Sequence, residues 1–462
     1  MARIGTLRWK MLALMLLGTV IIYVDRNVLG VLAPILKKEL NFTTEQYSYV
    51  VSSFQLVYSF AQPVAGYVTD LIGPRIGYAV AAFVWGLAAA LHGLSTGWIS
   101  MAGFRALLGL SEAVAIPTGT KMSTVWFPSR ERSIATGWFN SGSSIGSMIT
   151  PPLVIFIAAS YGWRPAFLIT GFLGVALSLL WYWLYRDPEA HPSLSPAELS
   201  YINEGREPPP AQKPSLKPLF AQWRFVGIIV ARFLTEPAWQ TFAFWIPLYM
   251  VSVRGMDIKQ FALFAWLPFL ASDIGCIFGG YLAPSLHKRL HLNMVNARLT
   301  VISIGAVCMV GPALISFVVD PITAILCFSL GGFAHQMLSS MMYALMGDVF
   351  EKPEVATATG VAGMFGYLGG ALFTLLVGAL ANTIGYEPLF AMLFAFDLVA
   401  ATTLWAFNGV RRGTAAAQAA ELGSGRPRRD LSRHERCTSA AQTVDPPPHK
   451  FGDRSRICGA AA

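Results

Sequence analysis

The sequence predicts an all-α membrane protein in which twelve transmembrane helices form two bundles of six. Three observations lead to this class. The 462-residue chain is 54% hydrophobic and only 13% charged, with a mean hydropathy of +0.52, whereas about 25% of the residues in a soluble domain are charged. Apolar runs of about 20 residues, the length that spans a bilayer, recur along the chain. The runs are continuous and do not alternate, which favours helices over barrel strands.

Each predicted span is an apolar run bounded by charged or turn-forming residues. The first run is longer than the apolar core of a signal peptide and lacks a small-residue cleavage site, so we expect it to be retained. A polar segment rich in proline and charge, 187–223, separates the sixth span from the seventh. The expected spans are 11–36, 47–69, 77–96, 99–125, 134–158, 164–185, 225–251, 261–284, 297–318, 322–347, 356–381 and 387–408.

This arrangement indicates an internal duplication, with bundles at 1–186 and 224–408 joined by a cytoplasmic linker at 187–223. Transporters are commonly built from such repeats, and their substrate sites lie at mid-membrane where the repeats meet. Lysine and arginine concentrate on the loops that are cytoplasmic if both termini are inside, as expected for an inner (plasma) membrane protein. The net charge of +9 therefore reflects topology rather than nucleic-acid binding. The basic segment 409–462 has no apolar periodicity and is expected to be a disordered cytoplasmic tail.

Charged residues interrupt two of the predicted spans. Asp25 and Arg26 are adjacent in the first span, and a charge at the centre of a membrane helix costs at least about 2.5–3.5 kcal/mol. Arg105 and Glu112 are nearly two helical turns apart, so they share one face of the fourth span. An acid and an arginine in each of two spans indicate a cavity that binds an anion and carries a proton.

The chemistry of these side chains suggests distinct roles. A planar guanidinium binds a carboxylate through two hydrogen bonds, so Arg26 is a candidate substrate anchor; the alternative is a structural ion pair with Asp25 or Glu112. Burial favours the protonated form of a carboxyl and a nearby arginine favours the ionised form, so Asp25 and Glu112 are candidate proton carriers. The alternative is that each carboxylate is permanently paired. Both roles can also hold in turn, with arginine paired to the acid until substrate replaces it.

Weaker candidates lie on other predicted spans. Asn140 and Ser141 belong to a polar stripe that either faces substrate or permits close packing around neighbouring glycines. Trp239 either stacks on a sugar ring or anchors an interface, and His335 and Gln336 either bind substrate hydroxyls or join helices.

Other features allow simpler interpretations. Arg232 and Glu236 are four residues apart and are expected to form an ion pair on one helix face. The glycine-rich run 360–370 is interpreted as helix packing. The cysteines lack metal spacing, and no catalytic constellation accompanies the histidines, so neither a metal, a cofactor nor an enzyme activity is expected. A monomer is expected.

Short turns with glycine and basic residues follow the second and eighth spans, at 66–77 and 279–290. Asp70 and Arg75 in the first of these predict a gating turn, the alternative being an ordinary charged turn. The run GYVTDLIGPRIG resembles the signature turn of the major facilitator superfamily, G-x-x-x-D-x-x-G-x-R-x-G. With YVDRNVLGVLAP, FRALLGLSEAVAIPTG and the loop WFPSRER, the chain is similar to the anion:cation symporter branch, and within it to hexuronate transporters, over about 1–408.

The resemblance implies the major facilitator fold and proton-coupled symport of a sugar acid or similar small organic anion by alternating access. A sodium-coupled or uncoupled organic anion carrier or exchanger is the alternative. The resemblance also implies that Arg26 holds the substrate carboxylate and that Asp25 and Glu112 exchange protons. One departure is Met341, which stands where hexuronate transporters usually have asparagine. The candidate substrate-binding residues are Arg26, Tyr58, Arg105, Asn140, Ser141, Trp239, His335, Gln336 and Ser339, and the candidate gating residues are Asp70, Arg75 and Arg132.

Overall fold

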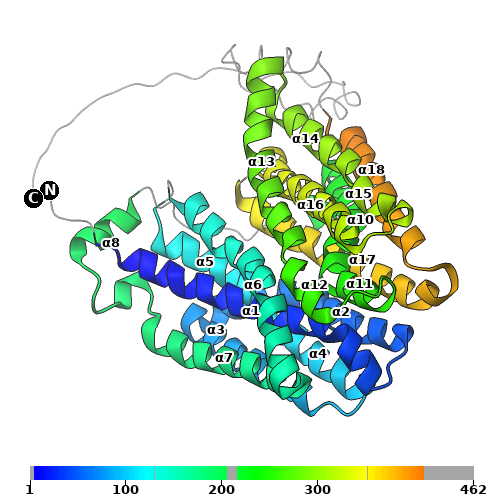
Figure 1. The fold of residues 1–462 in the computed structure, drawn as a ribbon. Coiled ribbons are helices and arrows are strands. Elements are labelled where there is room, and N and C mark those ends of the chain that lie inside the picture. The colour runs from blue at the N-terminus through cyan, green and yellow to red at the C-terminus, as the bar shows by residue number, and fades with distance from the viewer. Residues whose placement is uncertain (1–4, 129–130, 205–215, 351, 410–462) are drawn as a thin grey trace, which may run out of the picture. The chain divides into compact units, whose positions relative to one another are not determined.

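The computed structural model describes residues 5–128, 131–204, 216–350 and 352–409. In these ranges the chain forms helices joined by short turns, and no strand occurs among them (Figure 1). From residue 410 onward the predicted tail lies outside the described residues.

The first half contains six helical paths. Gly73 and Gly162, with φ of 85° and 86°, separate consecutive helices with almost no loop, because glycine adopts positive φ without steric cost. Thr43 begins its helix in a capping box with Gln46. α1 packs against α6, α2 against α4 and α3 against α7. The helices are α1 (Leu7–Glu39), α2 (Thr44–Ile72), α3 (Pro74–Leu91), α4 (Trp98–Glu112) continued by α5 (Ala115–Trp126), α6 (Arg132–Tyr161) and α7 (Trp163–Leu184).

The second half contains six further paths, three of which are broken into shorter helices. Breaks fall just before Pro247 and Pro268, since proline suits the first turn of a helix but not its interior. α13 packs against α16, and α10 packs against α17 and α18. The helices are α10 (Trp223–Phe244) with α11 (Ile246–Ser252), α12 (Ile258–Phe264) with α13 (Leu267–Leu290), α14 (Met294–Cys308) with α15 (Val310–Ala313), α16 (Pro321–Val349), α17 (Lys352–Ile384) and α18 (Glu387–Asn408).

Each of the twelve predicted spans coincides with one of these paths, so the predicted fold class is confirmed. Within the described ranges, ten paths are both long enough and apolar enough to cross a membrane. The other two, α2 and the α10–α11 path, are long enough but do not meet the same condition on hydropathy and charge. Both paths pack against other helices, and both carry buried polar side chains of their own: Gln55 on α2, and Arg232 and Glu236 on α10. Their lower hydropathy therefore reflects the interior polar groups that they carry.

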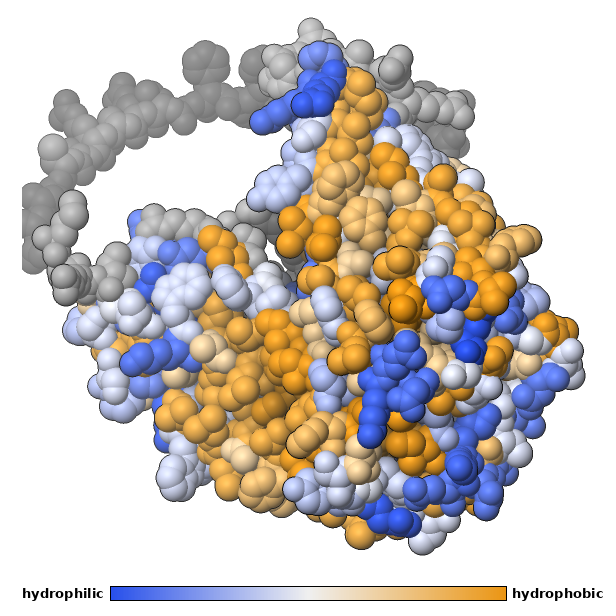
Figure 2. Space-filling model, viewed as in Figure 1, coloured by the Kyte–Doolittle hydropathy of each residue, from blue (hydrophilic) through white to orange (hydrophobic). Residues whose placement is uncertain are grey.

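Apolar side chains cover the outer faces of several helices, as expected for a surface that meets lipid. On α7, Phe172 is 68% exposed and Trp183 75% exposed; on α13, Ile277 is 61% exposed and Tyr281 76% exposed. Figure 2 shows hydrophobic residues gathered over much of the visible face, between more hydrophilic ends.

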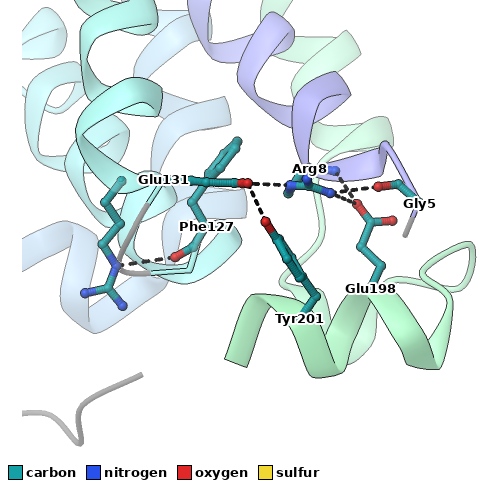
Figure 3. Close-up of polar contacts among 7 residues, drawn as sticks. Gly5, Arg8, Phe127, Glu131, Glu198 and Tyr201 are labelled. Carbon is teal, nitrogen blue, oxygen red and sulfur yellow. Dashed lines mark hydrogen bonds and ion pairs between the residues drawn. The ribbon is translucent and has the colours of Figure 1, made fainter. Parts of the chain in front are cut away.

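The segment between the halves contains α8 (Pro196–Asn203) and α9 (Leu216–Ala221), and a charge cluster ties α8 to the first half (Figure 3). Arg8, at the start of α1, donates from Nε to Glu131 at 3.1 Å and from Nη1 to Glu198 on α8 at 3.3 Å. Tyr201 of α8 donates to the same Glu131 at 2.5 Å, and its ring lies 4.8 Å from the Arg8 guanidinium. One buried arginine thus joins the beginning of α1, the loop before α6 and α8.

Candidate functional site

Arg26 forms a buried ion pair with Glu112. Arg26 is 6% exposed, on a stretch of α1 that is enclosed on every side, and Glu112 is fully buried at the last position of α4. The Nη2 and Nε atoms of Arg26 lie 2.7 and 3.0 Å from Glu112 Oε2. The other oxygen of Glu112, Oε1, has no hydrogen-bond partner among the described residues. In this state the substrate-anchor candidate is paired with a proton-carrier candidate.

Aromatic rings surround the Arg26 guanidinium. It lies 4.8 to 4.9 Å from the ring centroids of Tyr23, Phe54 and Tyr58, and cation–π contacts favour the charged form of the arginine. Its Nη1 donates to the hydroxyl of Tyr367 on α17 at 2.8 Å, and the Tyr367 ring packs on Tyr58 with centroids 4.5 Å apart. The predicted residue Tyr58 therefore lies in the site, although its ring and not its hydroxyl contacts Arg26.

Arg105 lies behind this pair and is fully buried. Its Nη1 donates to the backbone carbonyl of Arg26 at 3.2 Å, and its guanidinium lies 4.9 Å from the Phe54 ring and 5.3 Å from the Phe244 ring. Its Nε and Nη2 have no partner among the described residues. Arg105 therefore holds the α1 backbone at Arg26 and adds a second positive charge on that side.

Asp25 makes no ion pair with Arg26 among the described residues, which agrees with the angle of about 100° between neighbours on a helix. Asp25 is 2% exposed, and neither of its carboxyl oxygens makes a hydrogen bond within the described residues. Thr170 of α7 is a polar neighbour. Of the two partners considered for Arg26, Glu112 is the one that it contacts.

A second buried ion pair lies on α10, as the spacing of Arg232 and Glu236 predicts. Arg232 Nη2 lies 2.7 Å from Glu236 Oε2. Arg232 also donates from Nη1 to Ser339 Oγ at 3.0 Å and from Nη2 to the Tyr343 hydroxyl at 3.0 Å, both on α16. The predicted substrate residue Ser339 is thus bonded to an arginine of its own half.

Polar contacts between the halves join the N-terminal half of α2 to the C-terminal end of α10. Tyr47 donates to the carbonyl of Phe244 at 2.9 Å, and Gln55 donates to Gln240 at 3.0 Å. Ser144 on α6 donates to Asp273 on α13. These bonds must break if the halves are to separate there.

The remaining substrate-site candidates are dispersed. Trp239 is half-buried and stacks over His335 with ring centroids 6.4 Å apart; His335 is 2% exposed, and its Nδ1 has no partner in the described part of the chain. Gln336 is half-buried. Asn140 is exposed, and the Ser141 hydroxyl donates to the carbonyl of Trp138 on its own helix. No contact found in the described residues connects Asn140 or Ser141 with Arg26.

The predicted gating residues make separate contacts. Arg75 donates to the backbone carbonyl of Tyr182 at 3.1 Å, and its guanidinium lies 4.6 Å from the centroid of the Tyr182 ring. Arg132 donates to the carbonyl of Phe127 at 3.3 Å. The side chain of Asp70 lies outside the described part of the structure. The gating role of the three residues stays a prediction.

Sequence reasoning missed Tyr367 and Tyr343. Tyr367 stands alone as a polar side chain in the run 360–370, which we interpreted only as helix packing. Tyr343 follows Ser339 by four residues and so shares its helix face. Tyr367 bonds Arg26 and Tyr343 bonds Arg232, the arginines of the two buried ion pairs, so a lone tyrosine in a glycine-rich span was an available signal.

A model of the Major Facilitator Superfamily matches residues 15–319. The hexuronate transporter of Escherichia coli strain K12 is 45% identical over 409 residues, which cover 88% of this chain and 95% of the relative. The galacturonate transporter of Dickeya chrysanthemi is 42% identical over 331 residues, covering 71% and 96%.

Two solved structures share the fold. A bacterial homologue of the human lysosomal transporter Spinster, inward-facing and occupied, aligns with a TM-score of 0.67 at 15% identity over 87% of this chain and 97% of its own. A D-xylose–proton symporter aligns with a TM-score of 0.68 at 14% identity over 86% and 97%. The matched family, the two similar transporters and the twelve helical paths agree: the chain belongs to the major facilitator superfamily of membrane transporters.

Proposed function

We propose that this protein is a secondary active transporter that carries a sugar acid of the hexuronate class together with a proton, by alternating access. The observation that carries the proposal is the Arg26–Glu112 pair, a buried guanidinium bonded to a single carboxylate oxygen. The similarity to a hexuronate and a galacturonate transporter supports the substrate class. A sodium-coupled or uncoupled carrier or exchanger is the alternative.

Exchange of partners on Arg26 would link the proton to the substrate. When Glu112 takes a proton, it loses the negative charge that holds Arg26, and the substrate carboxylate then accepts the Nε–H and Nη2–H bonds in its place. When the substrate leaves, the proton leaves Glu112 and the ion pair forms again. The cation is never left unpaired, which matters because an unpaired buried charge is costly.

Asp25 is the second position at which a proton would be held. A buried carboxylate with few hydrogen bonds is expensive in free energy, and the polar side chain beside Asp25, Thr170, has a hydroxyl that donates to the carbonyl of Phe167. Arg105 would strengthen the field that attracts the substrate anion, and the partly exposed Trp239 ring would pack on the sugar, with His335 beside it.

Alternating access requires the halves to separate at one end and close at the other. The bonds from Tyr47 to Phe244 and from Gln55 to Gln240 hold the halves together here. Arg26 also bonds Tyr367 in the second half, so occupancy of the site alters a contact between halves. We place the protein in the inner (plasma) membrane as a monomer, with both termini cytoplasmic.

Proteoliposomes with a trapped pH dye would test this function. External galacturonate, glucuronate, galactonate and a neutral hexose are added in turn, and labelled galacturonate uptake is measured in parallel. The proposal expects acidification with a sugar acid and none with the hexose, and it expects no acidification with the Arg26→Ala variant. Arg164→Ala, which removes an exposed arginine, is the matched control. Uptake without acidification would support the sodium-coupled or uncoupled alternative.

A further inference from the structure

The second ion pair, Arg232–Glu236, differs from the first in how its carboxylate is held. Glu236 accepts from Arg232 at Oε2, 2.7 Å away, and from the Gln240 amide at Oε1, 3.4 Å away. Glu112 accepts only from Arg26, and its Oε1 has no partner among the described residues. Glu236 therefore has donors on both oxygens, whereas Glu112 has them on one.

The donors of Glu236 belong to a longer chain of bonds. Gln240, which donates to Glu236, accepts at its own Oε1 from Gln55 of the first half at 3.0 Å. Removing the charge of Glu236 would disturb two buried amides as well as Arg232. Removing the charge of Glu112 disturbs Arg26 alone. A substrate carboxylate can therefore replace Glu112 on Arg26 with little disturbance, whereas the hydrogen bonds of Glu236 keep it paired with Arg232.

Both pairs lie against the same stretch of α17. Tyr367 bonds Arg26. A Cβ at the preceding residue, Gly366, would lie 3.5 Å from both Arg232 Nη2 and Glu236 Oε2. Gly366 thus lies against the second pair, one residue before the tyrosine that bonds the first.

The second pair offers both donors and an acceptor to a ligand. Arg232 Nε has no partner among the described residues, so this N–H remains available to a ligand oxygen. Tyr343, whose hydroxyl bonds Arg232, is 44% exposed. The carboxylate of Glu236 accepts hydrogen bonds from hydroxyl groups. A single N–H beside a carboxylate suits a hydroxyl group, but it suits a second carboxylate poorly because two negative charges would then meet in a buried site.

We propose that Arg232, Glu236, Ser339 and Tyr343 form a hydroxyl-binding subsite that remains an ion pair during transport and excludes sugar acids with a carboxylate at both ends. This inference rests on the proposed function, in which Arg26 binds the first carboxylate. Arg105 bonds the backbone of Arg26 and lies beside Phe54 and Phe244, so its charge acts at the same end of the site as Arg26 and does not provide a separate position for the second carboxylate. The ligand class is therefore a polyhydroxylated monocarboxylate.

Competition binding tests the subsite. Purified protein in nanodiscs is loaded with labelled galacturonate, which is displaced by unlabelled galacturonate or by galactarate, the diacid of the same carbon skeleton. For the wild type we expect galactarate to bind about a hundredfold more weakly, the size of effect seen when a buried charge lacks a partner.

The Glu236→Gln variant provides a gain-of-function test. It frees the charge of Arg232, so galactarate should gain at least about tenfold in affinity relative to galacturonate. Glu45→Gln, which removes an exposed glutamate, should leave the ratio unchanged.

The possible results separate the two proposals. Equal affinity of the wild type for both acids overturns the subsite and leaves the proposed function intact. No binding of any sugar acid overturns the proposed function. An unchanged ratio in a folded Glu236→Gln variant also overturns the subsite, and the wild-type ratio provides the test if that variant does not fold.

Discussion

Arg26 of α1 donates a hydrogen bond of 2.8 Å to the hydroxyl of Tyr367 on α17, so a side chain of one half is bonded to the other half at the ion pair itself. The same guanidinium is bonded to Glu112. A ligand that takes Arg26 from Glu112 therefore also acts on a contact between the halves. Substitutions of Arg26, Glu112 and Tyr367 should therefore have different effects, which can be measured separately.

Arg26→Ala should abolish binding of galacturonate. Truncating one partner of a buried, hydrogen-bonded charge pair costs about 2–5 kcal/mol, and Glu112 would in addition lose the only hydrogen-bond donor that it has among the described residues. Equilibrium binding of labelled galacturonate to purified protein measures the effect. Affinity retained within a few-fold of the wild type would assign the carboxylate to Arg105 instead.

Glu112→Gln should preserve binding and exchange but abolish accumulation driven by a pH gradient. The amide has nearly the shape of the carboxyl but cannot carry a proton on and off. Counterflow of labelled galacturonate in proteoliposomes reports exchange, and uptake after a pH jump reports accumulation. If accumulation persists at the wild-type level, Asp25 or another group carries the proton.

Tyr367→Phe should weaken galacturonate binding or slow its transport by a modest factor. The ring that packs on Tyr58 is kept, and only the hydrogen bond to Arg26 is lost, a change of about 0.5–1.5 kcal/mol. Initial rates and affinities are compared with those of Tyr281→Phe, an exposed tyrosine on α13. Parameters identical to the control would show that the bond has no role in the cycle.

Arg8→Ala should lower the thermal stability of the detergent-solubilised protein without changing the affinity for substrate. The substitution leaves Glu131 and Glu198 without their arginine. The loss should stay below the about 3–5 kcal/mol of a fully buried pair, because the side chain of Glu131 is 18% exposed. A double-mutant cycle with Glu198→Gln isolates the coupling. Additive losses in that cycle would mean that Arg8 and Glu198 do not stabilise each other.

The charged part of the site was predictable from the sequence because it violates the rule that membrane helices avoid charge. Asp25, Arg26, Arg105 and Glu112 stand out in apolar runs, and the structure encloses all four. Which acid pairs with Arg26 was not predictable. That choice depends on how α1 is rotated against α4, and hydropathy does not encode the rotation.

Small polar residues carried less information. Asn140 and Ser141 suit a binding site and a helix surface equally well, and the structure leaves Asn140 exposed and Ser141 bonded within its own helix. The helical paths themselves followed from the length and continuity of the apolar runs. The two least apolar paths, α2 and α10–α11, were nevertheless recognisable because each still has enough residues to cross a bilayer.

The single exchangeable carboxylate on Arg26 has a consequence for energetics. If a substrate anion replaces the anion of Glu112, one proton stays behind on that glutamate and Asp25 keeps its own proton in both states, the net charge of the site is the same when loaded and when empty. An elementary charge that crosses a potential of 100 mV gains or loses about 2.3 kcal/mol in the field. A transport cycle in which the loaded and the empty site have the same net charge carries no net charge across, so the potential does no work on it. The voltage across the membrane would then leave the transport equilibrium unaffected, and the pH difference alone would set how far the sugar acid is concentrated.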